Sequence, residues 1–317
     1  MPPTPWDLTS ENRDKGIGRR EACKYCGSPK LVKNGHSKGQ QVFLCRTCGH
    51  GFYANGRFPK ARTPPELIAF ALDGYFNGLS LKKVRRAIQK QFGQTVSRRG
   101  IWRWAVKYSE LVDGMVANLR PDLSGMWEAD ETVVWVRGQP TWIWNALDKG
   151  TRFLVGSWMS TSREVSEARA FLDETKRRAD RPKLIVTDGL QSYNQAIWKT
   201  YGSLRKDRNA KHVRSPGLKK GDKNGIERFH GTFKERYKVM RGLKNPATGF
   251  ALVKGFNLHY NFLRPHEALG ERTPAEAAGI RLPFEDGWAN LIDWATIFDA
   301  RSRVSSDDSS DTPSPTN

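Results

Sequence analysis

The sequence lacks any long hydrophobic run and has few cysteines. No stretch approaches the roughly 18 consecutive apolar residues of a membrane-spanning helix. The first residues, MPPTPWDLTSENRDKG, contain no apolar segment like that of a secretory signal. We therefore expect an intracellular, reducing compartment and no membrane association. The 4 cysteines then need a role other than disulfide bonds.

Acidic residues are also scarce relative to basic ones. The 317 residues include 53 Lys or Arg against 33 Asp or Glu, which gives a formal net charge of +20 at pH 7. Such a field attracts the phosphate backbone of nucleic acids, although a ribosome-like or membrane-surface protein could be equally basic. Hydrophobic residues make up 38% of the chain and include 11 Trp, which is enough for packed cores. The composition therefore excludes wholesale disorder, and the length suits about two or three domains.

The four cysteines occur in two C-x-x-C-G motifs, which are typical of zinc knuckles. They are Cys23, Cys26, Cys45 and Cys48, with 18 residues between the two pairs. Tetrahedral Zn²⁺ accepts four thiolates from two such tight turns, so residues 21–55 are predicted to form a zinc ribbon. Between the pairs we expect a hairpin with Asn34-Gly35 as its turn. Structural or redox cysteines are the alternatives, and His36 and His50 are weaker candidates as ligands.

Residues 62–120 have the pattern of three helices joined by short turns. Ser80 and Ser97 are suited to cap the second and third helices, and Gly93 to end the second. This pattern is typical of a helix-turn-helix domain, in which the N-terminal side chains of the last helix enter the major groove of DNA. Those side chains would be Arg98, Arg99, Arg103 and Lys107. A small helical bundle with a solvated basic face is the alternative.

Residues 124–280 alternate between strand and helix patterns. β-branched and aromatic runs predict strands at 127–136, 141–148, 151–160, 183–189 and 211–215, with helices at 163–179, 190–202 and 224–237. The order βββαβαβα predicts an α/β fold with a ribonuclease H-like core. A C-terminal helical extension is expected at 281–300. By composition, residues 1–20 and 301–317 are predicted to be disordered termini.

Three carboxylates within this core lie in contexts that suit one metal site. Asp130 lies in the first strand, Asp188 ends the fourth, and Glu227 opens the last helix. Two Mg²⁺ ions, or Mn²⁺ in their place, prefer such hard oxygen ligands and can clamp both reacting oxygens of a phosphodiester. The rival acids are Glu128, Asp148, Asp222 and Glu235, of which Asp148 fits a turn better.

Basic residues concentrate around the third carboxylate. Residues 204–244 hold 14 Lys or Arg and 4 Asp or Glu. The DNA contacts predicted here are Lys219 and Lys220, in a loop that could fold over DNA, and Arg228 and Lys234, on the helix of Glu227. A solvated loop is the alternative, and His259 and His266 either position DNA or simply pack.

These motifs together resemble a known family. The segments WEADET, NALDKGTRFLVG, VTDGLQSYNQAI, NGIERFHGTFKERYKVMRGLK and NFLRPHEALGERTPAEAAG are similar to those of DDE insertion-sequence transposases with a retroviral-integrase-like core. The DET, TDG and NxxER segments resemble the insertion-sequence-six group. The resemblance implies that Asp130, Asp188 and Glu227 form the catalytic triad. The 38 residues between Asp188 and Glu227 slightly exceed what is usual in such cores.

The function implied by this resemblance is metal-dependent cleavage at transposon ends followed by strand transfer into target DNA. It implies double-stranded DNA partners (terminal repeats and target), at least a homodimer, a prokaryotic cytoplasmic location with the nucleoid, and a replicative, cointegrate-forming route. Two other functions remain open. One is a DNA-binding regulator with a zinc ribbon, a helix-turn-helix domain and an inert core; the other is a nuclease that acts on RNA or hybrids without strand transfer.

Overall fold

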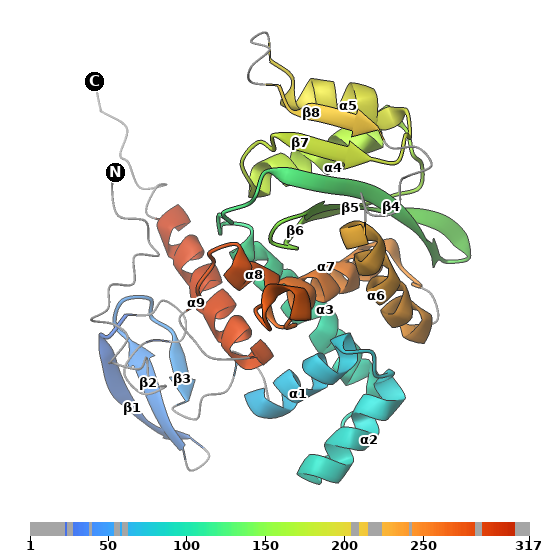
Figure 1. The fold of residues 1–317 in the computed structure, drawn as a ribbon. Helices are drawn as coiled ribbons and strands as arrows, with labels where there is room; N and C mark the ends of the chain where they lie inside the picture. Colours follow the sequence, from blue (N-terminus) through green and yellow to red (C-terminus); the bar gives the residue numbers. More distant parts are fainter. Residues whose placement is uncertain are drawn as a thin grey trace, which may run out of the picture. The chain divides into compact units, whose positions relative to one another are not determined.

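The computed structural model describes residues 23, 28–37, 40–53, 58, 63–203, 209–214, 224–240, 243–282 and 287–307. It divides into two compact units (Figure 1). One unit comprises the chain up to Ala71 together with the residues from Leu282 onward, and the other comprises Leu72–Arg281. Within the described part of the chain, no helix combines the length and apolar character needed to cross a membrane.

The first unit contains a small antiparallel sheet at the predicted ribbon. Its strands are β1 (Leu31–Ser37), β2 (Gln40–Cys45) and β3 (Gly51–Tyr53), in that order. The predicted turn at Asn34-Gly35 is wrong, because both residues lie inside β1, where the pairing register shifts between Lys33 and His36. Gly35 has φ +69°, and a β-bulge uses this left-handed conformation as readily as a hairpin turn does. The two strands remain paired as far as Ser37 and Gln40.

The first unit also contains the long helix α9 (Gly287–Asp307). Its buried face includes Trp288, Leu291, Ile292 and Ala295. The helix continues seven residues into the segment predicted to be a disordered tail from residue 301. A helix that is already nucleated gains a hydrogen bond for each residue added, so it extends into sequence that would not start a helix. Residues 1–20 and 308–317, also predicted to be disordered, lie outside the described residues.

Three helices occupy the region predicted to be a helix-turn-helix domain. They are α1 (Pro65–Phe76), which crosses the boundary between the two units, α2 (Leu81–Phe92) and α3 (Arg98–Val116). Both predicted N-caps are confirmed: the Ser80 hydroxyl accepts from the Lys83 amide at 3.3 Å, and that of Ser97 from the Gly100 amide at 2.9 Å. Gly93 ends α2 in the left-handed conformation, as predicted.

The core of the second unit is a mixed five-stranded sheet. Its strands are β4 (Met126–Val136), β5 (Gln139–Asp148), β6 (Leu154–Ser160), β7 (Leu184–Thr187) and β8 (Lys211–Arg214). Their order is β6-β5-β4-β7-β8; β4, β5 and β6 form an antiparallel meander, and β7 and β8 run parallel to β4. This arrangement confirms the predicted ribonuclease H-like core.

Helices cover both faces of this sheet. On one face lie α4 (Val165–Arg178) and α5 (Ser192–Tyr201), and on the other α6 (Asn224–Met240) and α7 (Pro246–Phe262) (Figure 1). The short helices η3 (Glu267–Leu269) and α8 (Pro274–Ala277) follow. Because a sheet with apolar residues on both faces needs two covering layers, α6 is held against β4 and β5.

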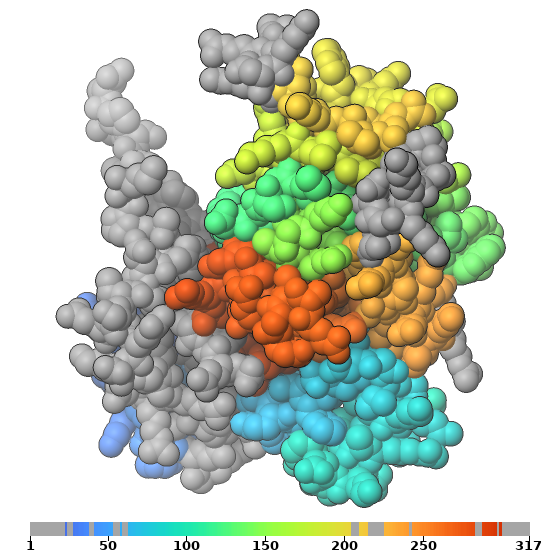
Figure 2. Space-filling view, in the orientation of Figure 1, coloured from blue at the N-terminus to red at the C-terminus, as the bar shows by residue number. Residues whose placement is uncertain are grey.

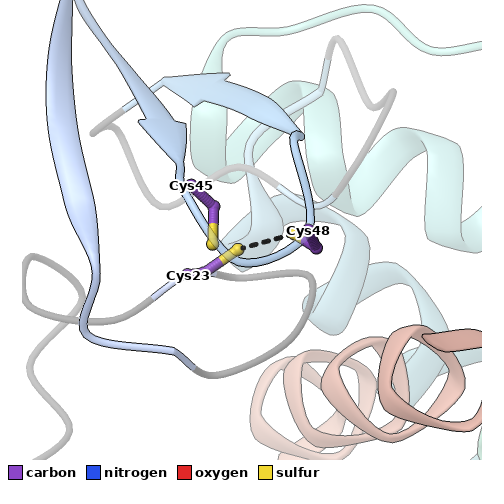
Figure 3. A group of neighbouring side chains, drawn as sticks. All are labelled: Cys23, Cys45 and Cys48. Carbon is purple, nitrogen blue, oxygen red and sulfur yellow. Dashed lines mark hydrogen bonds between the residues drawn. The ribbon is translucent and has the colours of Figure 1, made fainter. Parts of the chain in front are cut away.

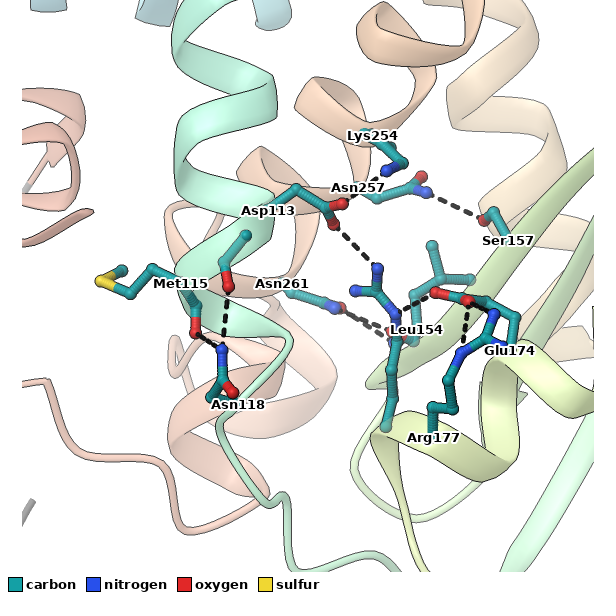
Figure 4. A network of polar contacts seen from close by, with 12 residues as sticks. Asp113, Met115, Asn118, Leu154, Ser157, Glu174, Arg177, Lys254, Asn257 and Asn261 are labelled. Carbon is teal, nitrogen blue, oxygen red and sulfur yellow. Dashed lines mark hydrogen bonds and ion pairs between the residues drawn. The ribbon is translucent and has the colours of Figure 1, made fainter. Parts of the chain in front are cut away.

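Helix α3 packs on α7, so the helical region and the core, predicted as separate domains at 62–120 and 124–280, share one compact unit from Leu72 onward. A buried polar network joins them (Figure 4). The Asp113 carboxylate of α3 accepts from Lys254 Nζ of α7 at 2.6 Å and from Arg178 Nη2 of α4 at 3.0 Å. A carboxylate with two cationic partners is satisfied in the interior, which ties α3 to the core in one position.

We expect Gly255→Ala to destabilise this unit by about 1–3 kcal/mol, as overpacking typically does. A Cβ on Gly255 of α7 would lie 2.4 Å from Phe76 Cζ and closer still to the Ser109 hydroxyl of α3. Urea unfolding of both variants measures the effect. The control is Gly114→Ala on α3, where a Cβ meets nothing within 4 Å and the helix should become slightly more stable. Equal effects of the two substitutions would contradict this account of the helix packing.

Candidate active site

Two of the predicted catalytic carboxylates meet beside β4, just past the C-terminal end of β7. Strand β7 pairs with β4 only over Met126–Glu128, so Asp130 lies just beyond the paired stretch. Asp188 follows directly after Thr187, the last residue of β7. The carboxylate oxygens of Asp130 and Asp188 lie within 4.8 Å of each other and of the Glu131 carboxylate. The parallel pairing of the two strands therefore brings the first two acids together.

Glu131 is the acid that the sequence reasoning missed. Its carboxylate accepts from Arg163 Nη1 at 3.3 Å and from the Tyr193 hydroxyl at 3.2 Å. Burial, and then the charge of Asp188, raise the pKa of Glu131; burial and Glu131 together raise the pKa of Tyr193. Adjacent strand residues normally point to opposite faces of a sheet, so the sequence pattern pairs Asp130 with Glu128 and not with Glu131. Glu131 can join the acidic group because β7 is short and stops pairing with β4 at Glu128, which leaves β4 without a neighbour on that side at Asp130 and Glu131.

Glu227 lies in the first turn of α6, where its side chain is exposed. Among the described residues, Glu227 does not belong to the group formed by Asp130, Glu131 and Asp188. His230, three residues further along the same helix, is buried with Nδ1 3.7 Å from Asp130 Oδ2 and Nε2 3.0 Å from Asn145 Nδ2. Because Asn145 donates to Nε2, the imidazole proton is placed on Nδ1, toward Asp130. His230 thus brings α6, the helix of Glu227, beside Asp130.

The rival acids have other partners or positions. Asp148 accepts from the Ser124 hydroxyl at 2.8 Å and from the Thr151 amide at 3.0 Å, which confirms it as a turn residue. Glu128 is buried and accepts from the Ile226 amide at 2.8 Å. Glu235 is exposed on α6, and Asp222 lies outside the described residues.

The predicted DNA contacts lie at the surface wherever the structure describes them. Arg98, Arg99, Arg103 and Lys107 are exposed on α3, and Arg228 and Lys234 on α6. Helix α2, which precedes α3, is also open at the surface in cyan in Figure 2. Glu227 and Lys234 are seven residues apart and therefore share one stripe of α6. Lys219 and Lys220 fall outside the described residues.

Of the two C-terminal histidines, His259 is buried and His266 is half-buried. His266 stacks edge-on against Tyr260 with a ring separation of 4.7 Å. His259 is buried, with Nε2 3.1 Å from Asn77 Oδ1 and Nδ1 3.9 Å from Asp73 Oδ1. Burial, and then the charge of Arg264, lower the pKa of His259 to about 4.

The unfolding free energy is therefore expected to fall as the pH drops from about 6.5 to about 4. In that window the unfolded chain binds a proton at His259 and the folded protein does not. The shift corresponds to a loss of about 3 kcal/mol, which His259→Gln should remove. Urea unfolding at several pH values measures it, with His36→Gln, at an exposed position, as control. An unchanged acid limb in His259→Gln would contradict this assignment.

Three of the four predicted zinc ligands lie together in the first unit. The sulfurs of Cys23, Cys45 and Cys48 are mutually within 4.8 Å, with Cys23 Sγ 3.6 Å from Cys48 Sγ (Figure 3). Cys26, the fourth, lies outside the described residues. His36 and His50 are not in this group, and His50 Nδ1 instead lies 3.0 Å from the Cys48 carbonyl.

Comparisons with known proteins find a family and relatives that resemble this chain. Residues 124–266 match a family model described as a DDE domain. The transposase for insertion sequence-like element IS431mec of Staphylococcus aureus (strain Mu50 / ATCC 700699) is 22% identical over 192 residues, 59% of this chain and 83% of that protein. The transposase for insertion sequence element IS257 in transposon Tn4003, also from Staphylococcus aureus, has the same identity and coverage.

Among solved structures, the HTLV-2 integrase catalytic core domain in complex with magnesium (trimeric form) aligns with a TM-score of 0.38 at 15% identity. The alignment covers 50% of this chain and 98% of the integrase core domain. The family match itself identifies residues 124–266 as a DDE domain, the catalytic domain of a polynucleotidyl transferase. Over a longer stretch the chain is similar to insertion-sequence transposases, in agreement with its resemblance to the insertion-sequence-six group.

Proposed function

We propose that this transposase cuts DNA at the ends of an insertion sequence and transfers the freed 3′ strand into target DNA, with Asp130, Asp188 and Glu227 as its catalytic acids. The observation that carries the proposal is the meeting of Asp130 and Asp188 at the open edge of β4, inside the matched DDE domain. Glu227 is assigned by its place on α6, on the helix whose His230 contacts Asp130.

The acidic group fits the divalent metal that DDE enzymes use. It offers only hard carboxylate oxygens, and burial, followed by repulsion from the charge of Asp188, raises the pKa of Glu131. A cation would relieve that repulsion. We assign Asp130, Asp188 and Glu227 as the ligands of two Mg²⁺ ions, with Mn²⁺ as a substitute. Bound there, Mg²⁺ supplies charge neutralisation at the phosphodiester and activation of the attacking oxygen.

The chain's own residues then orient the acids and the DNA. His230, fixed by Asn145, faces Asp130 and limits its rotation. Arg163 and Tyr193 hold Glu131 by hydrogen bonds, so that it stays beside Asp188. Arg228 and Lys234, exposed on the helix of Glu227, are assigned to the phosphates of the bound strand. Lys219 and Lys220 are assigned to the same DNA.

The N-terminal parts are assigned to recognition of the element's ends. We assign one structural Zn²⁺ to Cys23, Cys26, Cys45 and Cys48, three of which already surround a common point. The exposed basic residues of α3 are assigned to the major groove, with α2 and α3 as a helix-turn-helix pair. Their base contacts would select terminal repeats, while the core reads only the phosphate backbone.

Joining two ends in one reaction requires at least two copies of the active site, so the active form is proposed to be a homodimer or larger. Its partners are the double-stranded terminal repeats and the target DNA. We assign it to the prokaryotic cytoplasm, with the nucleoid DNA, and the bacterial origin of its relatives supports this assignment. The insertion-sequence-six resemblance favours a replicative route through a cointegrate.

The experiment that tests this function incubates the purified protein with labelled DNA carrying the element's own ends, with Mg²⁺ present or chelated. We expect nicks at the 3′ ends and joined products only with the metal. Tight binding of the ends without cleavage in Mg²⁺ or Mn²⁺ would favour a DNA-binding regulator. Cleavage of RNA or hybrids without joining would favour a nuclease.

A further inference from the structure

The start of the helix that carries Glu227 is anchored on a buried acid. Glu128, on β4 two residues before Asp130, is 1% exposed, and its Oε2 accepts from the Ile226 amide at 2.8 Å. The Gly225 amide also donates to this carboxylate. The first amides of a helix have no partner within the helix and carry partial positive charge, so a carboxylate satisfies them well. Glu128 therefore caps α6 from a neighbouring strand.

The approach of α6 to the sheet at this point leaves no room for a side chain. A Cβ on Gly225 would lie 2.6 Å from Arg152 Nη1, 2.8 Å from Glu128 Oε2 and 3.0 Å from Leu147 Cδ2. Three groups from two strands and the turn between β5 and β6 thus converge on one backbone position. That position is two residues before Glu227.

Arg152 reaches this point from a strained turn. Its φ of +59° is in the left-handed region that a residue with a side chain rarely adopts. The turn is held by Asp148, whose carbonyl accepts from the Arg152 amide at 2.9 Å. The guanidinium charge acts on Glu128, Tyr260 and His266. Backbone strain of this kind persists where the surroundings require a side chain in one place.

Two further contacts join α6 to strands β4 and β5, each further along the helix. Asn145 and Asp130 meet His230, and the Tyr237 hydroxyl lies 2.6 Å from the Trp135 amide. The contact at Glu128 is the first of the three and the one nearest to Glu227. It therefore controls the position of the first turn of α6, the turn that carries Glu227.

We propose that Glu128 and Arg152 are positioning residues of the active site, which hold the first turn of α6 so that Glu227 can share metal ligation with Asp130 and Asp188. This inference rests on the proposed function, because it takes Glu227 as the third ligand. Glu128 itself is not a ligand, since its carboxylate is occupied by the amides of α6. The sequence hypothesis that Glu128 competes with Asp130 for the metal is thereby replaced by a role through α6.

The test measures Mn²⁺ binding to the full-length protein by calorimetry, together with the Mg²⁺ dependence of strand transfer and thermal unfolding. The variants are Glu128→Ala, Glu128→Gln and Gly225→Ala. The matched control is Gly231→Ala on the same helix, where a Cβ meets nothing within 4 Å. Asp188→Asn reports whether the proposed metal site itself exists.

We expect Glu128→Ala and Gly225→Ala to weaken Mn²⁺ binding by about 10–100-fold, the usual effect of removing support behind a metal ligand. Glu128→Gln keeps an oxygen acceptor of the same reach and should restore most of the affinity, and Gly231→Ala should match the wild type. Wild-type Mn²⁺ affinity in folded Gly225→Ala and Glu128→Ala, with affinity lost in Asp188→Asn, would overturn the positioning role alone. Wild-type affinity in Asp188→Asn as well would overturn the proposed metal site.

Discussion

Replacing Asp188 by asparagine is expected to abolish both cutting and joining of DNA while leaving binding to the element's ends unchanged. The substitution keeps the size of the side chain but removes a negative charge from the acidic group at the edge of β4. Charge stabilisation of the transition state by a bound metal is worth several kcal/mol, and each 1.4 kcal/mol changes a rate tenfold. We therefore expect a loss of about three orders of magnitude or more in both steps.

Single-turnover cleavage and strand-transfer assays measure the loss, and gel shifts with end DNA measure binding. The matched control is Asp180→Asn, the same substitution at an exposed position shortly before β7. Joining by a pure sample of Asp188→Asn at a rate near that of Asp180→Asn would remove Asp188 from the catalytic site. Loss of end binding together with activity would instead indicate damage to the fold.

The second large effect is expected at the cysteine cluster. Cys45→Ser should release zinc and unfold the ribbon, because Cys45 is fully buried and shares its core with Cys23 and Phe52. Zinc binding to small modules contributes about 10–16 kcal/mol of apparent free energy, far more than so small a core supplies. Metal analysis should find about one Zn²⁺ per wild-type chain and far less in the variant.

The control for this experiment is His36→Ala, which removes the weaker candidate ligand on β1. We expect it to retain zinc at the wild-type level. Retention of zinc and of the folded ribbon in Cys45→Ser would contradict the four-cysteine site, and loss of zinc in His36→Ala would move a ligand to that histidine.

The core strands could be predicted because each is bounded by strong local signals. Runs of β-branched and aromatic residues alternate with turns such as Arg137-Gly138, and the order of elements then leaves few possible folds. The caps at Ser80 and Ser97 were predictable for the same reason, since a hydroxyl before a helix satisfies its own neighbouring amides. The meeting of Asp130 and Asp188 could be predicted from the order of the strands that carry them.

The remaining features depend on contacts between segments far apart in the sequence. The role of Glu131 depends on where β7 stops pairing with β4, and that of Glu128 on where α6 begins. Asn34-Gly35 has the same local preference in a bulge as in a turn, so the sequence does not separate the two. The close approach of α3 and α7 at Gly255 is likewise a tertiary effect that periodicity does not encode.

The most direct test of the metal site is anomalous X-ray scattering from crystals of the protein soaked in Mn²⁺. We predict a peak at the bonding distance of about 2.1 Å from carboxylate oxygens of both Asp130 and Asp188, with Glu227 as the third acid. A peak held by Glu131 in place of Glu227 would change the identity of the third ligand. Absence of any peak at Asp130 and Asp188, in a metal concentration that supports strand transfer, would contradict the account.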